Sequence, residues 1–246
     1  MQTSEFIATA TLHQSRVDAY SNRMPRPKRI DQTGEIYHVL NRGNAKQIIF
    51  RKSKDYEAFE SILIDGIGRF SCDLYSYQLM PNHWHFVLSP RVNGEMSQLL
   101  RWITVTHSMR YHAHYQTSGQ GHVYQGRFKS FPVGNDEHFL RVCRYVERNA
   151  LRAGLVERAE DWRFGSLHRR VHRRSRDADF LSPWPVTEPS DWVAGVNGHD
   201  AESELSRIRK SVVRGCPYGG TEWVKAATER LDLHSTLRSR GRPRAK

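Results

Sequence analysis

Three observations on the sequence predict an α+β fold with a ferredoxin-like βαββαβ antiparallel sheet. Short runs of branched and aromatic residues alternate with stretches that carry apolar residues at helical spacing. Two strand-like runs meet directly at Pro81-Asn82, as in a β-hairpin. The runs follow the order βαββαβ and then one further helix, before a basic, partly irregular C-terminal extension. This order predicts about four antiparallel strands with helices on one face.

The first strand and helix are expected within residues 35–69. Residues 35–42 form a strand-like run that ends before Gly43. Residues 53 to about 65 carry apolar side chains at helical spacing. We expect Gly66 and Gly68 to end this helix, because glycine is unfavourable inside helices.

The hairpin carries the first candidate site. Successive side chains of a strand alternate between faces, so His83 and His85 share one face and Trp84 and Phe86 share the other. Two imidazoles spaced in this way can hold a metal ion. The alternative is an exposed hairpin face that happens to carry histidine, in a chain with 13 histidines.

The later elements are predicted from the spacing of apolar residues and from the residues that end or cap each element. Glycines at 126 and 134 bound a short strand, and Asp136 is suited to cap the helix after it. The remaining elements are expected as strands 73–80 and 83–89, helix 95–115, strand 127–133 and a helix from 136 to about 154.

The last of these helices carries the second candidate site. On its polar side, Tyr145 and Asn149 are one turn apart, with Arg141, Arg148 and Arg152 around them. Such a tyrosine lies where a phosphate would be held; the alternative is an amphipathic helix with a solvated basic side. The side expected to face the core carries Phe139, Val142, Cys143, Val146, Ala150 and Ala153.

Charge and composition narrow the function. Lys and Arg outnumber Asp and Glu by 38 to 26, a net charge of +12. Basic proteins of this kind bind polyanions, nucleic acid above all, although a basic surface without that function is the alternative. Three widely spaced cysteines suggest neither a disulfide framework nor a cysteine zinc site. No signal peptide or membrane span is recognisable, so a cytoplasmic protein is expected.

Other aromatic and histidine side chains are weaker candidates. The aromatic residues could stack on unpaired bases or simply pack in the core. Three histidines of the 95–115 helix are expected at the surface. These candidates are Trp102, Tyr111, Tyr115 and Tyr124, and the histidines are His107, His112 and His114.

The chain divides into three segments by composition. Residues 1–23 are aperiodic and precede Met24, so they are a disordered arm or lie upstream of the true start. Residues 24–155 hold the predicted sheet and both candidate sites. Residues 156–246 are basic, with two short helices expected at 202–214 and 221–233.

The last nine residues form a basic tail that we expect to be disordered. Arg240-Gly241-Arg242-Pro243 resembles an AT-hook, which places arginines in a narrow A·T-rich minor groove. The alternative is a solvated tail that binds any phosphate.

Two motifs resemble one known family. His83-Trp84-His85 is similar to the His-hydrophobe-His motif of the HUH endonucleases, and Tyr145 to Val156 resembles the tyrosine helix of their single-tyrosine transposases. Met80-Pro81-Asn82 and Gln125-Gly126-Arg127-Phe128 resemble the REP-associated branch, named after repetitive extragenic palindromes. The resemblance covers Met24 to about Ser166.

The resemblance implies site residues and a cofactor. Tyr145 would be the nucleophile, and His83 and His85 would bind Mg²⁺ or Mn²⁺ on the sheet. Asn149 takes the position of a third ligand, although relatives often carry glutamine or histidine there. The tyrosine helix would thus be an added catalytic helix, with DNA contacts expected from Arg141, Arg148, Arg152, Arg127, Lys129, Arg240 and Arg242.

The implied activity is cleavage and rejoining of single-stranded, palindromic hairpin DNA through a 5′-phosphotyrosine. One rival is a replication or plasmid-transfer initiator with the same nicking chemistry. Another is a catalytically idle DNA-binding protein that acts on palindromic repeats. A bacterial, nucleoid-associated protein is expected, and the sequence leaves monomer and homodimer open.

Overall fold

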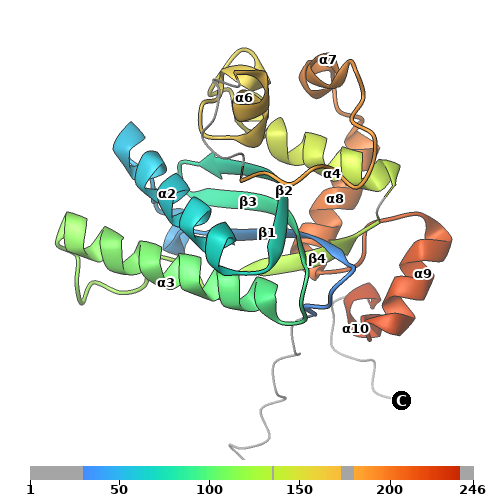
Figure 1. Ribbon diagram of the computed structural model, residues 1–246, viewed down its shortest axis with the longest axis horizontal. Helices are drawn as coiled ribbons and strands as arrows, with labels where there is room; N and C mark the ends of the chain where they lie inside the picture. Colours follow the sequence, from blue (N-terminus) through green and yellow to red (C-terminus); the bar gives the residue numbers. More distant parts are fainter. Residues whose placement is uncertain (1–29, 135, 173–179, 239–246) are drawn as a thin grey trace, which may run out of the picture. The chain divides into compact units, whose positions relative to one another are not determined.

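The computed structural model describes residues 30–134, 136–172 and 180–238. The chain divides into residues 1–30 and 31–246, and every element below lies in the second unit. Its sheet has the strand order β2-β3-β1-β4, and each neighbouring pair is antiparallel. The strands are β1 Ile36–Arg42, β2 Cys72–Met80, β3 His83–Pro90 and β4 Lys129–Val133 (Figure 1). The predicted four-stranded antiparallel sheet and the element order are confirmed.

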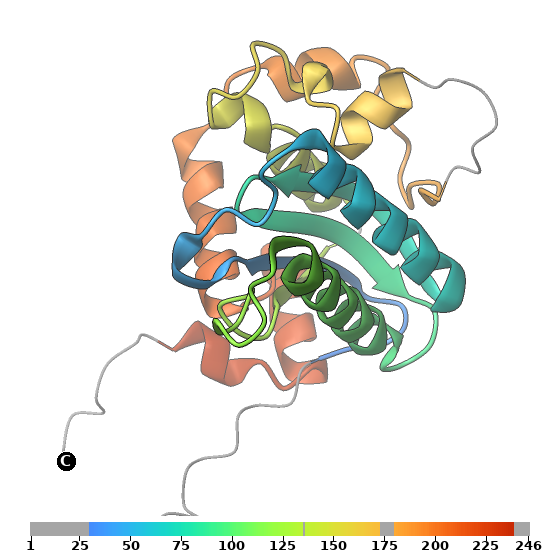
Figure 2. The same ribbon diagram turned by 90° about the vertical axis from the view of Figure 1, so that its left-hand side faces the viewer.

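Helices α2 (Ser53–Arg69) and α3 (Glu95–Tyr115) pack against each other on one face of the sheet (Figure 2). Phe59 of α2 lies against Trp84 and Phe86 of β3, with ring centroids 6.3 and 6.4 Å apart. The bounds of α3 are those predicted from the sequence.

Two sequence-based expectations for these helices are wrong. Gly66 does not end α2, because it lies where α2 meets α3: a Cβ atom there would be 2.8 Å from Leu99 Cδ1. Its missing side chain therefore permits close helix packing. His107 is buried rather than exposed; its ring packs against Phe50, and its Nδ1 lies 2.7 Å from the Tyr124 hydroxyl.

The opposite face of the sheet is also covered, so the expectation of helices on one face is wrong. Helices α4 (Glu137–Glu147) and α5 (Asn149–Arg152) follow β4, and α4 packs on β2 and β3. Both faces need cover because β2 and β3 bury nearly all their residues. The α4 and α5 core positions are buried as predicted, except Ala153, which is exposed beyond the end of α5.

The C-terminal segment adds further helices, three of which contribute to the core on this face. Helix α8 (Glu202–Arg214) has its predicted bounds, α9 (Thr221–Arg230) ends earlier than expected, and the other helices of this segment are not among those predicted from the sequence. The helices are α6 Ser166–Val171, α7 Trp192–Asn197, α8 Glu202–Arg214, α9 Thr221–Arg230 and α10 His234–Leu237. The core of α4 is joined by Leu167 of α6, Trp192 and Val196 of α7, Ile208 of α8, and Tyr218 from the loop between α8 and α9.

Some expectations fall outside the described residues. Residues 1–23 and the AT-hook-like tail are among them. Within the described ranges, no helix has the length and apolar character needed to cross a bilayer.

Candidate active site

His83 and His85 lie side by side on β3, with ring centroids 4.9 Å apart. His83 Nδ1 is 2.6 Å from the side-chain oxygen of Asn82, which leaves Nε2 free of this bond. His85 is only 3% exposed. The alternative of an exposed hairpin face is therefore wrong for His85, because α4 packs on the same face of the sheet.

A third histidine, His38 on β1, joins this pair. Its Nε2 lies 2.9 Å from Nδ1 of His85, and its ring is fully buried. Strand β1 pairs with β3 so that His38 is opposite Val87, two residues from His85 and on the same face of the sheet. Sequence reasoning missed His38, since the only signal was a histidine inside an apolar strand and strand register is not readable there.

Tyr145 of α4 lies over the buried histidines although it is distant from them in the sequence. Its ring centroid is 6.0 Å from that of His85 and 6.1 Å from that of His38. The guanidinium of Arg152 lies 4.4 Å from the centre of the tyrosine ring. The structure thus brings together four of the residues singled out in the sequence, His83, His85, Tyr145 and Arg152.

Asn149 occupies a less defined place. It begins α5, one turn beyond Tyr145, and its side chain is half-buried. Its amide makes no hydrogen bond to any residue that the structure describes. A role for Asn149 as a metal ligand therefore remains a prediction from the sequence.

Burial keeps the three histidines uncharged. It lowers the pKa of His38 to about 3 and that of His83 to about 4, and it holds the pKa of His85 well below the usual range. Positive charge on Arg42 and Arg152 adds to the effect at His83. A neutral imidazole keeps the lone pair that a metal ion requires.

Arg42 is a second residue that sequence reasoning missed. In the antiparallel register it lies directly opposite His83. Its Nε is buried and has no hydrogen-bond partner within the described part of the chain. A buried, unpaired guanidinium N–H is costly unless an acceptor arrives, and a phosphate oxygen is a suitable one.

The arginines around Tyr145 are engaged by the C-terminal segment. Asp200 lies 3.0 Å from Arg148 Nε, 3.3 Å from Arg152 and 3.5 Å from Arg144. Arg148 also donates to the carbonyl of Val196 at 2.7 Å. These side chains therefore hold residues 196–200 against α4, and a DNA contact by them remains a prediction.

The other predicted DNA contacts differ in their surroundings. Arg141 pairs with Glu137 at 3.0 Å and with Glu204 at 3.2 Å. Arg127 and Lys129 are exposed at the start of the edge strand β4. The two tail arginines, Arg240 and Arg242, lie outside the described residues.

Glu147 holds α4, the helix that carries Tyr145, in place through buried hydrogen bonds. Its carboxylate is fully buried and accepts hydrogen bonds from Ser166 Oγ at 2.6 Å, Arg170 at 2.8 Å and Trp192 Nε1 at 2.8 Å. A bond from Ser76 Oγ at 3.2 Å ties the same carboxylate to β2. The position of Tyr145, two residues earlier, thus depends on this buried network.

The side chains of this site can be compared with the ligands that a divalent metal ion prefers. His83 and His85 present two neutral imidazoles side by side, which suits Mn²⁺ better than Mg²⁺. Within the described ranges, no three His, Cys, Asp or Glu side chains are grouped to hold an ion. Arg42 and Arg152 add positive charge near the histidines, and this charge repels a metal cation. The histidine pair therefore suits an ion that binds together with an anion such as phosphate.

Comparison with known proteins gives the family. A REP-associated tyrosine transposase bound to a REP hairpin is similar, with 18% identity over 68% of this chain and 93% of that one, and a TM-score of 0.49. A candidate transposase from Deinococcus radiodurans has 12% identity over 50% and 96% of the chains and a TM-score of 0.37. No curated protein matches. Residues 32–149 match the family model described as "Transposase IS200 like". The chain therefore belongs, through residues 32–149, to the family of IS200-like transposases.

Proposed function

We propose that this transposase cleaves and rejoins single-stranded DNA through a covalent bond to Tyr145. The observation that carries the proposal is the position of Tyr145, whose ring lies 6.0 Å from His85 with Arg152 against its face. A nucleophile, neutral imidazoles and guanidinium groups are thus gathered in one place. These are the groups that an attack on a phosphodiester requires.

The proposed reaction exchanges one phosphodiester for another. The Tyr145 oxygen attacks phosphorus and loses its proton, the P–O3′ bond breaks, and the leaving 3′ oxygen takes up a proton. The product is a 5′-phosphotyrosine and a free 3′-hydroxyl. Because the phosphate ester is conserved in the covalent bond, a later 3′-hydroxyl can reverse the step without ATP.

His83 and His85 would hold the divalent ion, Mg²⁺ or Mn²⁺, that the family resemblance implies. When bound, such an ion polarises the phosphoryl oxygens. His38 holds the ring of His85 through the shared hydrogen bond. Arg42, opposite His83, would donate its unpaired Nε–H to the phosphate.

The proposed substrate is a palindromic hairpin with a single-stranded flank. Its support is the net charge of +12 together with the motifs around Pro81 and Arg127 that resemble the REP-associated branch. Arg127 and Lys129, exposed on the edge strand, would contact the DNA backbone. Action on such repeats implies a place at the bacterial nucleoid, in the cytoplasm.

A covalent adduct tests the function. Wild-type protein is incubated with Mn²⁺ and single-stranded DNA from intergenic palindromes, followed by denaturing electrophoresis and, in parallel, light scattering for the oligomeric state. We expect an adduct with wild-type protein and none with Tyr145→Phe, which should still bind DNA. Tyr56→Phe, on α2 at the opposite face of the sheet, is the matched control and should form the adduct normally.

Two outcomes contradict the proposal. An adduct with Tyr145→Phe would exclude this nucleophile and direct attention to Tyr111 and Tyr124. Binding of every palindrome without any adduct would support the idle DNA-binding protein instead.

A further inference from the structure

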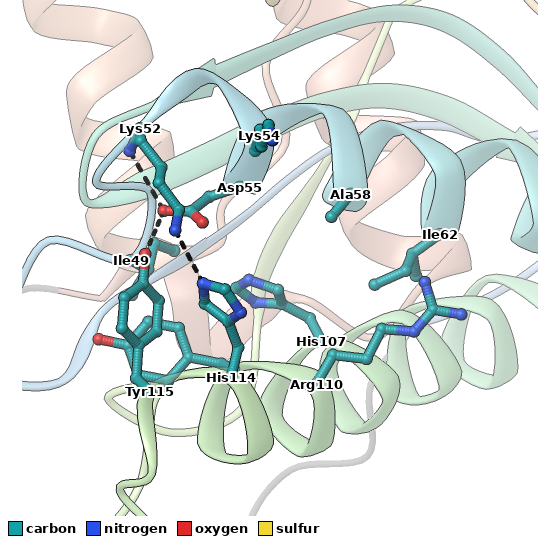
Figure 3. Close-up of a pocket in the computed structure, with 11 residues that line it drawn as sticks. Ile49, Lys52, Lys54, Asp55, Ala58, Ile62, His107, Arg110, His114 and Tyr115 are labelled. Atoms are coloured by element: carbon teal, nitrogen blue, oxygen red, sulfur yellow. Dashed lines mark hydrogen bonds between the residues drawn. The ribbon is translucent and has the colours of Figure 1, made fainter.

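A pocket of about 230 Å³ lies between α2 and α3, on the sheet face opposite α4 and Tyr145 (Figure 3). Ile49, Ile62 and the ring of His107 form its buried floor. The pocket is smaller than the cavities that take drug-sized ligands, and its apolar floor suits one flat ring. None of the active-site residues described above lines it.

Two tyrosines of α3 form an aromatic wall that is held in place. The Tyr115 hydroxyl donates to Asp55 Oδ2 at 2.6 Å, and the Tyr111 hydroxyl accepts from Arg51 at 2.9 Å. The Arg51 guanidinium also lies 4.3 Å from the centre of the Tyr115 ring. These contacts orient both rings before any ligand arrives.

The pocket is lined by cations that form no ion pair with an acid among the described residues, although Lys52 interacts electrostatically with Asp55 in the same lining. Lys52, Lys54 and Arg110 line it, and no carboxylate of the described residues forms an ion pair with any of them. Lys52 Nζ instead lies 2.9 Å from His114 Nε2, and imidazole does not compensate an ammonium charge. Asp55 is the single acid in the lining, and its Oδ2 already accepts backbone bonds as well as that of Tyr115.

This combination selects one class of ligand. Proteins that bind single strands pair an aromatic surface for the base with lysines and arginines for the backbone. We propose that the pocket binds an unpaired nucleotide of the DNA strand, with the base against Tyr111 and Tyr115 and the phosphate at Lys52, Lys54 and Arg110. The proposal rests on the proposed DNA-processing function and adds a DNA contact remote from the cleavage site.

Charge-removing variants test the phosphate contacts. Lys52→Gln combined with Arg110→Gln should weaken binding of a single-stranded oligonucleotide about tenfold at 0.1 M salt, and the slope of log affinity against log salt should shallow by about 1.4. Fluorescence anisotropy measures both. Lys210→Gln with Lys225→Gln, exposed on α8 and α9, removes the same charge elsewhere and should change neither. Equal shallowing in this control pair would assign the effect to net charge and overturn the proposal.

Photo-crosslinking tests the base contact. An oligonucleotide with 5-iodouracil should cross-link to the peptide that carries Tyr111 and Tyr115, both in wild-type protein and in Tyr145→Phe. Filling the pocket with Ala58→Phe, a change at an exposed α2 position, should abolish that cross-link. Thermal unfolding checks that each variant is folded.

The outcomes separate this site from the active site. A Tyr145 adduct without a cross-link at residues 111–115 would overturn the pocket assignment and leave the proposed function intact. A cross-link without an adduct would support the pocket while the proposed function fails. Competition by a free deoxynucleoside monophosphate at or below the oligonucleotide's own concentration would identify a free-nucleotide site and overturn the assignment to a DNA strand.

Discussion

Nε2 of His38 and Nδ1 of His85 are 2.9 Å apart, so two buried imidazoles on adjacent strands share one hydrogen bond. For His85 to bind a metal through Nε2, its Nδ1 must carry the proton and donate it to His38. His38 then carries its own proton on Nδ1, which has no hydrogen-bond partner within the described residues. The ring of Phe131 lies 4.8 Å away. The hydrogen bond thus sets the tautomer and orientation of the proposed ligand.

Replacing His38 should therefore weaken metal use. In His38→Phe the acceptor is lost, and the Mn²⁺ concentration for half-maximal adduct formation should rise about 10- to 100-fold, as for other partners of metal ligands. Excess Mn²⁺ should restore the rate, and His38→Gln should recover part of the affinity through its carbonyl. Unchanged Mn²⁺ dependence in His38→Phe would show that the hydrogen bond only serves packing.

His83→Ala and His85→Ala should each abolish divalent-ion-dependent cleavage, since each removes one imidazole of the pair. Chelation of metal should have the same effect on wild-type protein. Adduct formation is measured with EDTA and with Mn²⁺, and circular dichroism checks the fold. His122→Ala, at an exposed loop position, is the control. Full activity of the wild-type protein in EDTA would exclude the metal role.

Arg42→Gln should weaken DNA binding through loss of one phosphate contact. We expect about tenfold lower affinity for a single strand at 0.1 M salt and a salt slope shallower by about 0.7. Arg42→Lys keeps the charge and should retain the slope. Anisotropy titrations at several salt concentrations measure these values, with Lys225→Gln as the control. An unaltered slope in Arg42→Gln would mean that Arg42 does not reach the backbone.

Glu147→Gln should destabilise the fold, because Arg170 then loses its charged partner inside the protein. The expected loss is about 3–5 kcal/mol in the free energy of unfolding, measured by urea titration. Glu157→Gln, at an exposed position, should cost far less. The double variant Glu147→Gln/Arg170→Met should cost less than the sum of the single changes. Strict additivity would contradict the coupling.

Stability should fall in mild acid. Burial lowers the pKa values of His83 and His107 to about 4 and that of His38 to about 3, against about 6.5 in an unfolded chain. Below pH 6.5 the unfolded chain therefore binds more protons, so the stabilisation present above that pH is lost as pH falls toward 4. Each histidine contributes at most about 1.4 kcal/mol per pH unit.

Urea midpoints at pH 7.5, 6.0 and 5.0 in EDTA measure this loss. His107→Phe should reduce the pH dependence between pH 6.5 and 5, whereas the exposed His122→Ala should not. A midpoint that stays constant or rises as the pH falls from 7.5 to 5.0 would show that the buried histidines do not destabilise the fold in acid.

Local patterns in the sequence were sufficient for the order of the strands and main helices of residues 35–155 and for the family. The period of apolar residues predicted the bounds of α3 and α8, and strand alternation placed His83 and His85 on one face. The two short motifs around His83 and Tyr145 led to the transposase family, which the match over residues 32–149 confirms. Each of these signals depends on neighbours in the chain and needs no knowledge of distant contacts.

Contacts between distant segments were decided only by the tertiary structure. The pairing of β1 with β3 places His38 beside His85 and Arg42 opposite His83. Packing of α4 and the C-terminal segment buries the histidine face and engages Arg148 and Arg152 through Asp200. Strand register and helix docking depend on the apolar surface that both contacting segments bury. The sequence of one segment alone does not determine that total.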